Sequence, residues 1–307
     1  MNKIKSKIKD IMMHTWFGVH FIEPIYKLWS YLWRYRPWVD DETRIKQIFK
    51  KKFGYNLDLD DPKTFNEKIN WLKIHNRTEL HVICSDKIRM REYVKEKIGS
   101  EYVVPLIFTS CDTNDININK LPNKPVVIKT NHDSGTVYLI NNKYESNLRK
   151  IRNGIHFGMK KNLYWYAREW NYKRIDPKIL VEDMLGKDSP GKLKDYKIFC
   201  ANGEPKFIQV DNDRFINHKR NLYDIQWNFI DVMYKCENFE IEEKPKEIDK
   251  MIVLSRKLSE PFNFSRIDMY IYENKIYVGE ITFFPEAGLT EFYPDKYNIF
   301  FGDMIKI

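Results

Sequence analysis

The stretch RIDMYIYENKIYVGEITFFPEAG, residues 266–288, decides the fold. Two runs of alternating apolar and polar residues flank a short polar turn, which predicts an antiparallel hairpin. Side chains two residues apart in a strand point to the same face. Arg266 and Asp268 therefore share one face of their strand, and Glu280 and Thr282 share one face of theirs.

The length of the turn decides whether these two pairs meet. A three-residue loop at 273–275 pairs Tyr272 with Ile276 and sets Asp268 opposite Glu280. A two-residue loop shifts the pairing by one position and sends the carboxylates to opposite faces. We expect the three-residue loop, which gathers two carboxylates, an arginine and a hydroxyl on one face.

Two adjacent carboxylates repel unless a cation lies between them, and hard oxygen ligands suit Mg²⁺ when a substrate phosphate completes the coordination shell. A solvent-facing hairpin with scattered charges is the alternative. The opposite face argues for a packed sheet, because it is apolar throughout: Ile267, Met269, Ile271, Ile281 and Phe283.

The composition is that of a globular chain. It has 307 residues, 43% of them hydrophobic, and a net charge of +9, which favours acidic partners without choosing among them. The four cysteines, Cys84, Cys111, Cys200 and Cys236, are widely spaced and predict neither a disulfide framework nor a zinc site. A reducing, cytoplasmic setting is expected.

Helical patterns come first along the chain and strands follow. Thr64 and Glu67 fit a capping box, with Asp61 as the alternative helix start, and Ser85 is expected to cap a second helix that ends at Gly99. Strands are predicted at 103–108, 124–130, 136–140 and 178–185, and a hairpin turns at Asn202-Gly203. This order indicates an α+β fold with antiparallel sheets.

Two further segments carry polar groups at the ends of apolar strands. In PVVIKTNHDSG, Lys129 ends a strand beside a loop whose N–H groups could hold phosphate. In ILVEDML, Glu182 ends a strand that leads into a short apolar link. Each segment alone is common in proteins and favours no function.

Taken in this order, Lys129 with its loop, the Glu182 segment, Arg266-x-Asp268 and Glu280-x-Thr282 resemble the ATP-grasp superfamily, and within it the D-alanine–D-alanine ligase pattern. The segments TFNEKINWLK, KTNHDSG, DYKIFCANGEPKFIQVDNDR and GEITFFPEAG together resemble the TupA-like ATP-grasp family of bacterial surface-polysaccharide loci. The resemblance covers about residues 45–307. It implies two α+β lobes whose antiparallel sheets sandwich ATP, preceded by a helical segment.

The resemblance implies a domain order and a set of site residues. The domains are a basic, Trp-rich segment at 1–40, a helical region at 41–100, a first lobe at 101–183 and a second lobe at 184–307. Residues implied to hold ATP are Lys129, His132, Ser134, Gly135, Glu182, Met184 and Lys197. Asp268, Glu280 and Thr282 would bind Mg²⁺, although asparagine is usual at the threonine position, and Arg266 and Lys129 would be catalytic.

The substrate lobe that usually precedes an ATP-grasp core is missing from the pattern, so the acceptor site must be built differently. The segment DNDRFINHKRNLYD offers a basic cluster that suits carboxylate or phosphate groups: Arg214, His218, Lys219 and Arg220. A solvated basic loop is the alternative.

The expected activity is therefore an ATP-dependent ligase that joins a carboxylate to an amine through an acyl phosphate. The substrates would be an acidic glycan or sugar carboxylate and an amino acid or amino sugar, with no nucleic acid partner. The alternative is a glycosyltransferase that uses the DxD triplet Asp211–Asp213 to hold a metal and a nucleotide sugar. A membrane-recruited binding protein with an inactive nucleotide site is a third possibility.

Residues 1–38 hold four of the eight tryptophans and seven basic residues against two acidic ones. Such a stretch either lies on an anionic membrane surface or packs on the core as a helical hairpin. Its uncharged run contains His14 and His20 and lacks a small-residue cleavage site, and no segment reaches the ~18 apolar residues of a spanning helix. We expect a cytoplasmic protein, peripheral at the inner face of the membrane.

Overall fold

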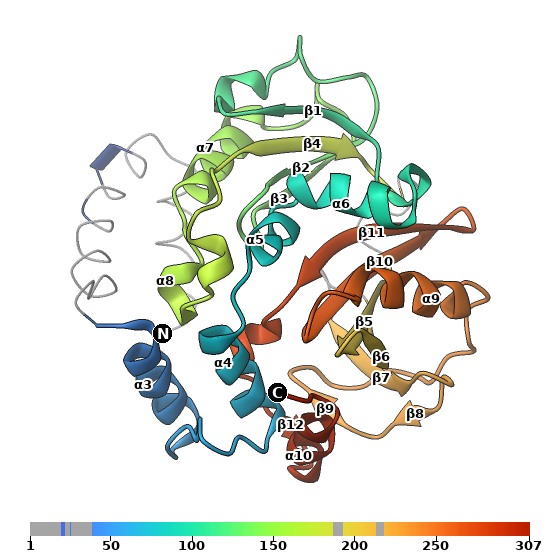
Figure 1. Ribbon diagram of the computed structural model, residues 1–307. Coiled ribbons are helices and arrows are strands. Elements are labelled where there is room, and N and C mark those ends of the chain that lie inside the picture. The colour runs from blue at the N-terminus through green and yellow to red at the C-terminus, as the bar shows by residue number, and fades with distance from the viewer. Residues whose placement is uncertain (1–19, 22–24, 26–38, 187–192, 213–217) are drawn as a thin grey trace.

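The computed structural model describes residues 20–21, 25, 39–186, 193–212 and 218–307 of the chain. The expectations for the Trp-rich segment, and the one for Arg214, fall largely or wholly outside these ranges. Figure 1 shows two sheets, one above the other, with helices between and beside them. No helix in the described ranges is long and apolar enough to span a bilayer.

The upper sheet has four antiparallel strands in the order β1-β4-β2-β3. They are β1 (Leu106–Ser110), β2 (Val126–Thr130), β3 (Val137–Ile140) and β4 (Ile179–Asp183). Helix α7 (Leu148–Met159) covers one face of the sheet, because its buried Ile151 and Ile155 pack against Ile128 of β2 and Val181 of β4 in one apolar cluster.

The lower sheet has six strands in the order β11-β10-β5-β6-β7-β8. They are β5 (Asp195–Ala201), β6 (Glu204–Asn212), β7 (Lys219–Asp224), β8 (Phe229–Ile230), β10 (Phe264–Tyr272) and β11 (Lys275–Thr282). The predicted turn between β5 and β6 is confirmed, since Asn202 and Gly203 both have positive φ (53° and 79°). Helix α9 (Ile248–Ser259) packs on this sheet with its apolar side.

Helices of residues 41–98 stand between and beside the sheets: α3 (Asp41–Phe53), α4 (Phe65–His75), α5 (Glu79–Ser85) and α6 (Arg89–Ile98). The remaining elements are short: α8 (Tyr164–Ala167), α10 (Lys296–Asp303), β9 (Met233–Tyr234), β12 (Phe292–Tyr293), η2 (Ser100–Tyr102), η3 (Thr113–Asp115), η4 (Trp170–Tyr172) and η5 (Pro285–Gly288).

The helix starts test two local predictions. The capping box of α4 is confirmed: Thr64 Oγ1 accepts from the N–H of Glu67, and the Glu67 carboxylate accepts from the N–H of Thr64. The cap assigned to Ser85 is wrong, because Ser85 is the last residue of α5 and its hydroxyl donates to the carbonyl of His81. Helix α6 begins three residues later than expected and ends, as predicted, at Gly99.

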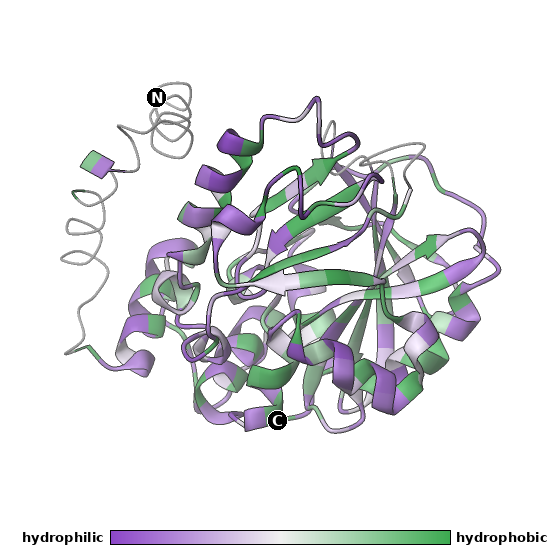
Figure 2. Cartoon of the chain, turned by 90° about the horizontal axis from the view of Figure 1, so that it is seen from above, coloured by the Kyte–Doolittle hydropathy of each residue, from purple (hydrophilic) through white to green (hydrophobic). Residues whose placement is uncertain are grey.

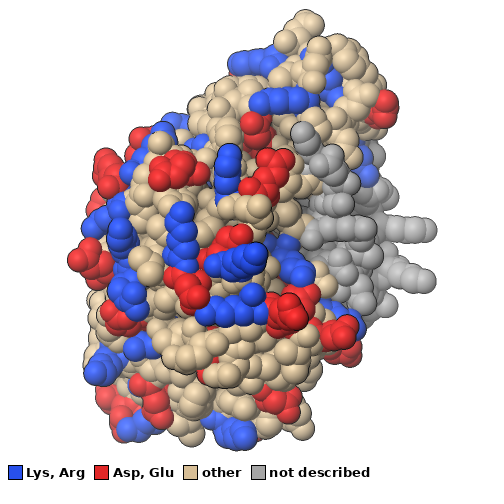
Figure 3. Space-filling view, turned by 90° about the vertical axis from the view of Figure 1, so that its right-hand side faces the viewer, with Lys and Arg blue, Asp and Glu red and all other residues tan. Residues whose placement is uncertain are grey.

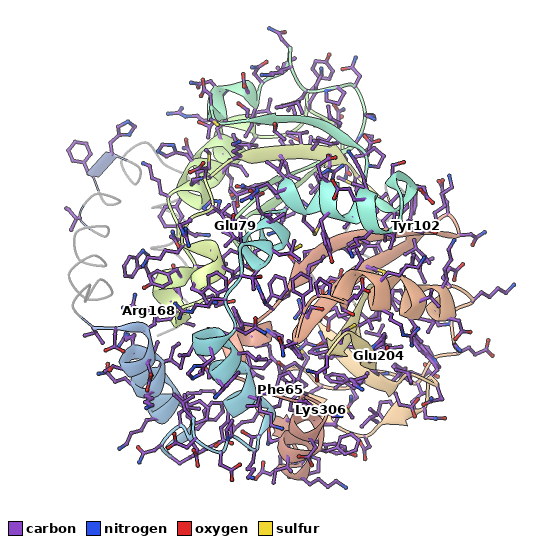
Figure 4. The ribbon with its side chains drawn as sticks, in the orientation of Figure 1. Phe65, Glu79, Tyr102, Arg168, Glu204 and Lys306 are labelled. Atoms are coloured by element: carbon purple, nitrogen blue, oxygen red, sulfur yellow. The ribbon has the colours of Figure 1, made fainter. Side chains whose placement is uncertain are left out.

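Apolar side chains hold the lobes together from the inside. Figure 2 shows the strands of both sheets largely in hydrophobic colours and the helices striped, as expected of amphipathic elements. In the lower lobe Phe65 of α4, labelled in Figure 4, packs edge-on against Phe264 and Phe292 and lies near Phe199. Helix α4 is thereby anchored to the second sheet.

The expected turn of the final hairpin is wrong, yet the expected pairing holds. The turn has two residues, Glu273 and Asn274, both with positive φ, and Tyr272 pairs with Lys275. A β-bulge then shifts the register between Asp268 and the next residue of β10. Because the bulge adds one residue, Gly279, to β11, Asp268 still lies opposite Glu280.

Candidate active site

A cavity of about 280 Å³ lies between the two sheets. Strands β2, β3 and β4 and the loop after β2 line it from above, and β10 and β11 line it from below. Six of the residues predicted for the site line this cavity: Lys129, Ser134, Gly135, Glu182, Met184 and Glu280. The cavity is therefore lined by five of the seven residues that the family resemblance assigned to ATP, together with Glu280.

Glu182 is buried on β4 and is held by two cations. Lys129 Nζ on β2 lies 2.5 Å from its Oε1, and Arg91 Nη1 on α6 lies 3.6 Å from its Oε2. The antiparallel pairing of β2 with β4 places Lys129 and Glu182 near one another, two positions apart in register. A nucleotide that enters the cavity meets a positively charged lysine whose position is already fixed by this carboxylate.

The loop after β2 is folded around the side chain of Asp133. Its carboxylate accepts from the hydroxyl groups of Thr130 and Thr136 and lies 3.2 Å from Lys161 Nζ. Gly135 has a φ of 89°, which favours glycine, and nothing lies within 4 Å of where a Cβ would stand. Contacts within the loop thus fix its shape, and its residues 133–136 line the cavity.

His132 lies in this loop, but the structure does not place it in the predicted ATP-binding role. Its Nδ1 lies 3.2 Å from Asn131 Oδ1 and its Nε2 lies 2.9 Å from the carbonyl oxygen of Lys161. Burial lowers the pKa of His132, against the opposing effect of its contact with Lys161. His132 is absent from the lining of the cavity and supports the loop instead of facing a ligand.

Lys87 lines the cavity and was missed by the sequence analysis. Its Nζ donates to the carbonyl of Asp133 at 2.8 Å and lies 3.7 Å from Glu280 Oε2. Lys87 therefore joins the loop of the first sheet to a carboxylate of the second. In the sequence analysis, the segment SDKIRM was assigned only to a helix. The one feature that could have indicated Lys87 is its position just before the start of that helix.

Arg266, Asp268, Glu280 and Thr282 form one cluster on the final hairpin, as predicted. The guanidinium of Arg266 donates to both oxygens of Asp268 at 2.7 Å, and its Nη2 also donates to Thr282 Oγ1 at 3.2 Å and lies 3.5 Å from Glu280 Oε1. Burial raises the pKa of Asp268 to about 6, against the opposing effects of Arg266 and Lys197.

Lys197 continues this cluster onto β5. Its Nζ lies 2.9 Å from Asp195, 2.9 Å from Asp211 and 3.8 Å from Asp268. Burial alone lowers the pKa of Lys197, but these carboxylates outweigh it and raise the pKa above its ordinary value. Lys197 is absent from the cavity lining, so its role in this structure is to join the hairpin carboxylate to β6.

The carboxylate of Asp211, the first member of the DxD triplet, has several hydrogen-bond and ion-pair partners. Arg220 donates to both of its oxygens, at 2.6 and 3.2 Å, and Gln209 Nε2 lies 3.0 Å from each. Although burial raises the pKa of Asp211, Lys197 and Arg220 hold it below its usual range. Asp213 lies outside the described residues.

The basic cluster expected to hold the acceptor does not form a single surface. Lys219 and Arg220 are adjacent on β7 and so point to opposite faces, and Arg220 is buried against Asp211. His218 Nε2 lies 3.2 Å from Asp211 Oδ1. Of the described members, Arg220 and His218 both reach Asp211, and Arg220 is a paired, positioned cation in this structure.

Charges of both signs are interspersed over the outside of the molecule. Figure 3 shows lysine, arginine, aspartate and glutamate side chains side by side on the face it presents. The net charge of +9 is not gathered there into one basic patch.

The oxygen-bearing side chains of the final hairpin are chemically suited to bind Mg²⁺. Asp268 and Glu280 are directly paired across β10 and β11, and the Thr282 hydroxyl lies 3.5 Å from Glu280 Oε1, so three hard oxygen ligands share one place. Within the described residues, no group of three His, Cys, Asp or Glu is arranged to hold a metal. A nucleotide phosphate would have to complete the coordination shell.

A family model described as TupA-like ATPgrasp matches residues 67–306. The chain belongs to the TupA-like ATP-grasp family. The match spans helix α4 from Glu67 onward, both sheets and every described residue of the cluster around Arg266. The architecture of two antiparallel sheets with a cavity between them agrees with this family, and membership predicts ATP-dependent ligase chemistry for this TupA-like chain.

Solved structures similar to this TupA-like chain include D-alanine–D-alanine ligases and a carboxyaminoimidazole synthetase. D-alanine–D-alanine ligase from Bacillus anthracis complexed with ATP is 16% identical, over 65% of this chain and 53% of that one, with a TM-score of 0.37. The Helicobacter pylori enzyme is 15% identical over 78% and 69%, with a TM-score of 0.41. N5-carboxyaminoimidazole synthetase from Staphylococcus aureus is 14% identical over 65% and 44%, with a TM-score of 0.35.

The chain thus spans about half the length of the first of these ligases. No match is found among the curated proteins.

Proposed function

We propose that this protein is an ATP-dependent carboxylate–amine ligase. The observation that carries the proposal is the continuity between the cavity and the charged hairpin: Glu280 lines the cavity and lies opposite Asp268, whose carboxylate is held by Arg266. A nucleotide in the cavity would therefore direct its phosphates at the only part of the described hairpin where carboxylates, arginine and hydroxyl meet.

The proposed reaction has two steps. A substrate carboxylate oxygen attacks the terminal phosphorus of ATP, the bond to ADP breaks, and an acyl phosphate forms. An amine nitrogen then attacks the acyl carbon, the bond to phosphate breaks, and the products are an amide, ADP and phosphate after loss of a proton from nitrogen. Positioning and neutralisation of charge account for most of the catalysis in such reactions.

The residues of the site have separate tasks in this scheme. Lys129 and the backbone of the 131–135 loop hold phosphate, and Glu182 with the backbone near Met184 takes the adenine end of the cavity. Arg266 stabilises negative charge on the transferred group or on the tetrahedral adduct. Asp268, Glu280 and Thr282 would hold Mg²⁺, which neutralises phosphate charge when bound.

The wider setting remains part of the proposal. The carboxylate substrate is an acidic glycan or sugar acid, the product belongs to a bacterial surface polysaccharide, and the enzyme works in the cytoplasm at the inner face of the membrane. The four-part domain order, with boundaries at 40/41, 100/101 and 183/184, is proposed alongside it. Of the predicted acceptor segment, Arg220 already pairs with Asp211.

The glycosyltransferase alternative gains no support from the site. Asp211 would have to bind a metal and a nucleotide sugar, but it is paired with Arg220, Gln209 and Lys197 and does not line the cavity. That alternative also leaves the cavity between the sheets without a ligand.

Nucleotide binding separates the two functions. Thermal shift is measured with ATP, UDP-glucose and UDP-glucuronate, each with and without Mg²⁺, for the wild-type protein and for Asp268→Asn. We expect stabilisation by ATP that depends on Mg²⁺ and is lost in the variant. Stabilisation by the UDP-sugars and not by ATP would overturn the ligase proposal.

A further inference from the structure

A thiol, an imidazole and a carboxylate lie in contact near β9, and the proposed ligase reaction gives the thiol no task. Sγ of Cys236 lies 3.5 Å from Nδ1 of His218, and Nε2 of the same ring lies 3.2 Å from Oδ1 of Asp211. A nucleophile next to a base, with a third group next to the base, is the arrangement that activates nucleophiles in enzymes. The three residues therefore form a candidate site for covalent chemistry.

The pairing of β7 with β6 fixes the position of His218. Arg220 lies opposite Asp211 in this pairing, and His218 precedes it by two positions, so both side chains point to the face on which Asp211 lies. Each of them reaches the Asp211 carboxylate. Within the described part of the chain Nε2 of His218 is buried and makes no hydrogen bond, so Asp211 acts on the ring through its charge.

A bend in the chain carries Cys236 to the imidazole. Lys235, at this bend, has a φ of 68°, which residues other than glycine rarely adopt. The residues that follow are tied to β7: the N–H of Arg220 donates to the carbonyl of Glu237 at 2.9 Å, and Nδ2 of Asn238 donates to the carbonyl of Arg220 at 2.9 Å. Unfavourable backbone conformations persist where the surrounding structure enforces them, and they gather at functional sites.

Cys236 differs from the other three cysteines in its surroundings. Cys84 and Cys200 are buried, and burial raises the pKa of each of these thiols to about 12. Cys111 is exposed. Cys236 is partly exposed, so a small reagent can reach it, and its sulfur is in contact with the ring of His218. Cys236 therefore combines access for a reagent with an adjacent base.

Charged side chains surround this thiol. Burial raises the pKa of Cys236, Arg220 and Lys235 oppose this effect, and Asp211 and Glu286 add to it. The sulfur therefore keeps its proton at neutral pH and becomes a nucleophile only when a base removes that proton. The imidazole in contact with the sulfur is such a base. The two cations can stabilise negative charge that develops on the sulfur or on a leaving oxygen.

We propose that Cys236 is a modification site: its thiol reacts with peroxides, and His218 is the base. A peroxide is small and polar, as access to a partly exposed thiol among charges requires. Its leaving oxygen takes up a proton, which His218 can return, and carries negative charge, which Arg220 and Lys235 can stabilise. This inference goes beyond the proposed ligase function and is independent of it.

The proposed step is balanced with the peroxide as oxidant. Nδ1 of His218 accepts the thiol proton while the sulfur attacks one oxygen of hydrogen peroxide. The S–O bond forms, the O–O bond breaks, and the leaving hydroxide takes the proton from the ring and departs as water. The sulfur of Cys236 is oxidised to sulfenic acid and the peroxide is reduced. The imidazolium that forms during the step lies beside the Asp211 carboxylate, which stabilises it.

The test compares two cysteines of the same chain. The full-length protein is treated at neutral pH with iodoacetamide, or with hydrogen peroxide followed by dimedone, which labels sulfenic acid, and each modified cysteine is quantified over time by mass spectrometry. We expect Cys236 to be alkylated at least about tenfold faster than the exposed Cys111, as general-base catalysis by an adjacent imidazole would give. We also expect Cys236 to be the main site of the dimedone adduct.

Variants of the base locate the effect. His218→Gln keeps a polar side chain but removes the base, and should slow alkylation and oxidation of Cys236 by at least about tenfold while leaving Cys111 unchanged. Added imidazole should restore part of the rate in His218→Ala, because a free base can enter the space that the side chain leaves. His75→Gln, at the exposed end of α4, is the matched control and should change neither rate.

Each outcome supports or overturns the site. Alkylation of Cys236 no faster than that of Cys111, or equal rates in the wild type and in His218→Gln, overturns the proposal. Fast alkylation without a dimedone adduct or a further oxidised sulfur at Cys236 also overturns it, because a peroxide would then be the wrong reagent. If His218→Gln lowers the melting temperature, His218→Ala decides: recovery of the rate with imidazole supports the base, and no recovery overturns it. None of these results depends on whether ATP binds.

Discussion

Asp268 and Glu280 lie directly opposite one another on β10 and β11, although the turn between these strands has the length that should send them to opposite faces. A single extra residue, Gly279, restores the pairing. The carboxylate pair on which the proposed Mg²⁺ site depends therefore results from two effects on the register that cancel: the length of the turn and the bulge at Gly279.

The first prediction concerns this pair. Asp268→Ala and Glu280→Ala each remove one of the two carboxylates proposed to hold Mg²⁺ with ATP. We expect loss of Mg·ATP-dependent stabilisation in thermal shift, with near wild-type circular dichroism. Wild-type nucleotide affinity in both variants would contradict the assignment, and Glu79→Gln, an exposed substitution on α5, serves as the control.

Gly279 should not tolerate a side chain. A Cβ there would stand 2.6 Å from Cε2 of Tyr270 and 3.2 Å from its Cζ. Gly279→Ala should therefore destabilise the protein by about 1–3 kcal/mol, measured by urea denaturation. Tyr270→Leu in the same chain should recover part of the loss; a double variant no more stable than Gly279→Ala would show that the ring is not the cause.

Lys73 should be costly to remove, because its buried ammonium group donates to three acceptors. These are Asn70 Oδ1 and the carbonyls of Ala167 and Ala287, at 2.8–3.1 Å. Lys73→Met fills the space but leaves the acceptors unpaired, at a cost of about 1–3 kcal/mol for each buried acceptor left unsatisfied. The free energy of unfolding is measured with denaturant. Lys68→Met, at a part-buried position of the same helix, is the comparison.

Glu169 should make stability depend on pH. Burial raises its pKa to about 7, although Lys73 opposes the shift. Between about pH 4.5 and pH 7 the unfolded chain has released this proton and the folded protein has not, so this carboxyl lowers the free energy of unfolding as pH rises. Glu169→Gln should therefore gain stability relative to wild type from pH 5 to pH 8.

Melting temperatures of both proteins across that range test the prediction. A difference between them that does not change with pH, or one that shrinks as pH rises, would contradict it.

Residues 1–38 should bring the protein to anionic membranes. Their tryptophans and excess of basic residues suit the headgroup region of such a surface. Vesicles of phosphatidylglycerol should retain the full chain at low salt and release it as salt is raised, because screening weakens the attraction. Equal retention of a chain lacking residues 1–38 would rule out this role.

Much of the architecture follows from local sequence. The capping box of Thr64 and Glu67 and the turn at Asn202-Gly203 involve residues within a few positions of one another, so their sequence patterns identify them. Alternation along β10 and β11 shows which residues share a face. The order of the motifs resembles that of the ATP-grasp superfamily, and the family match confirms this resemblance.

The contacts between distant segments required the tertiary structure. Lys87 joins the site because α6 lies beside the loop after β2, and Arg220 turns inward because β7 pairs with β6 and meets Asp211. His132 faces Lys161, which is far along the chain, and Ser85 ends a helix because its hydroxyl bonds to the preceding turn.

The final hairpin, with its bulge at Gly279, also separates what the local sequence determines from what tertiary packing determines. The local sequence determined a hairpin with acidic and basic residues at alternate positions, but the two-residue turn alone predicts the wrong face for Glu280. Packing on the apolar side of the sheet, where Ile267 and Ile281 are buried opposite one another, favours the register that the bulge restores. Burial of these side chains depends on neighbouring elements, and only the folded chain brings those elements together.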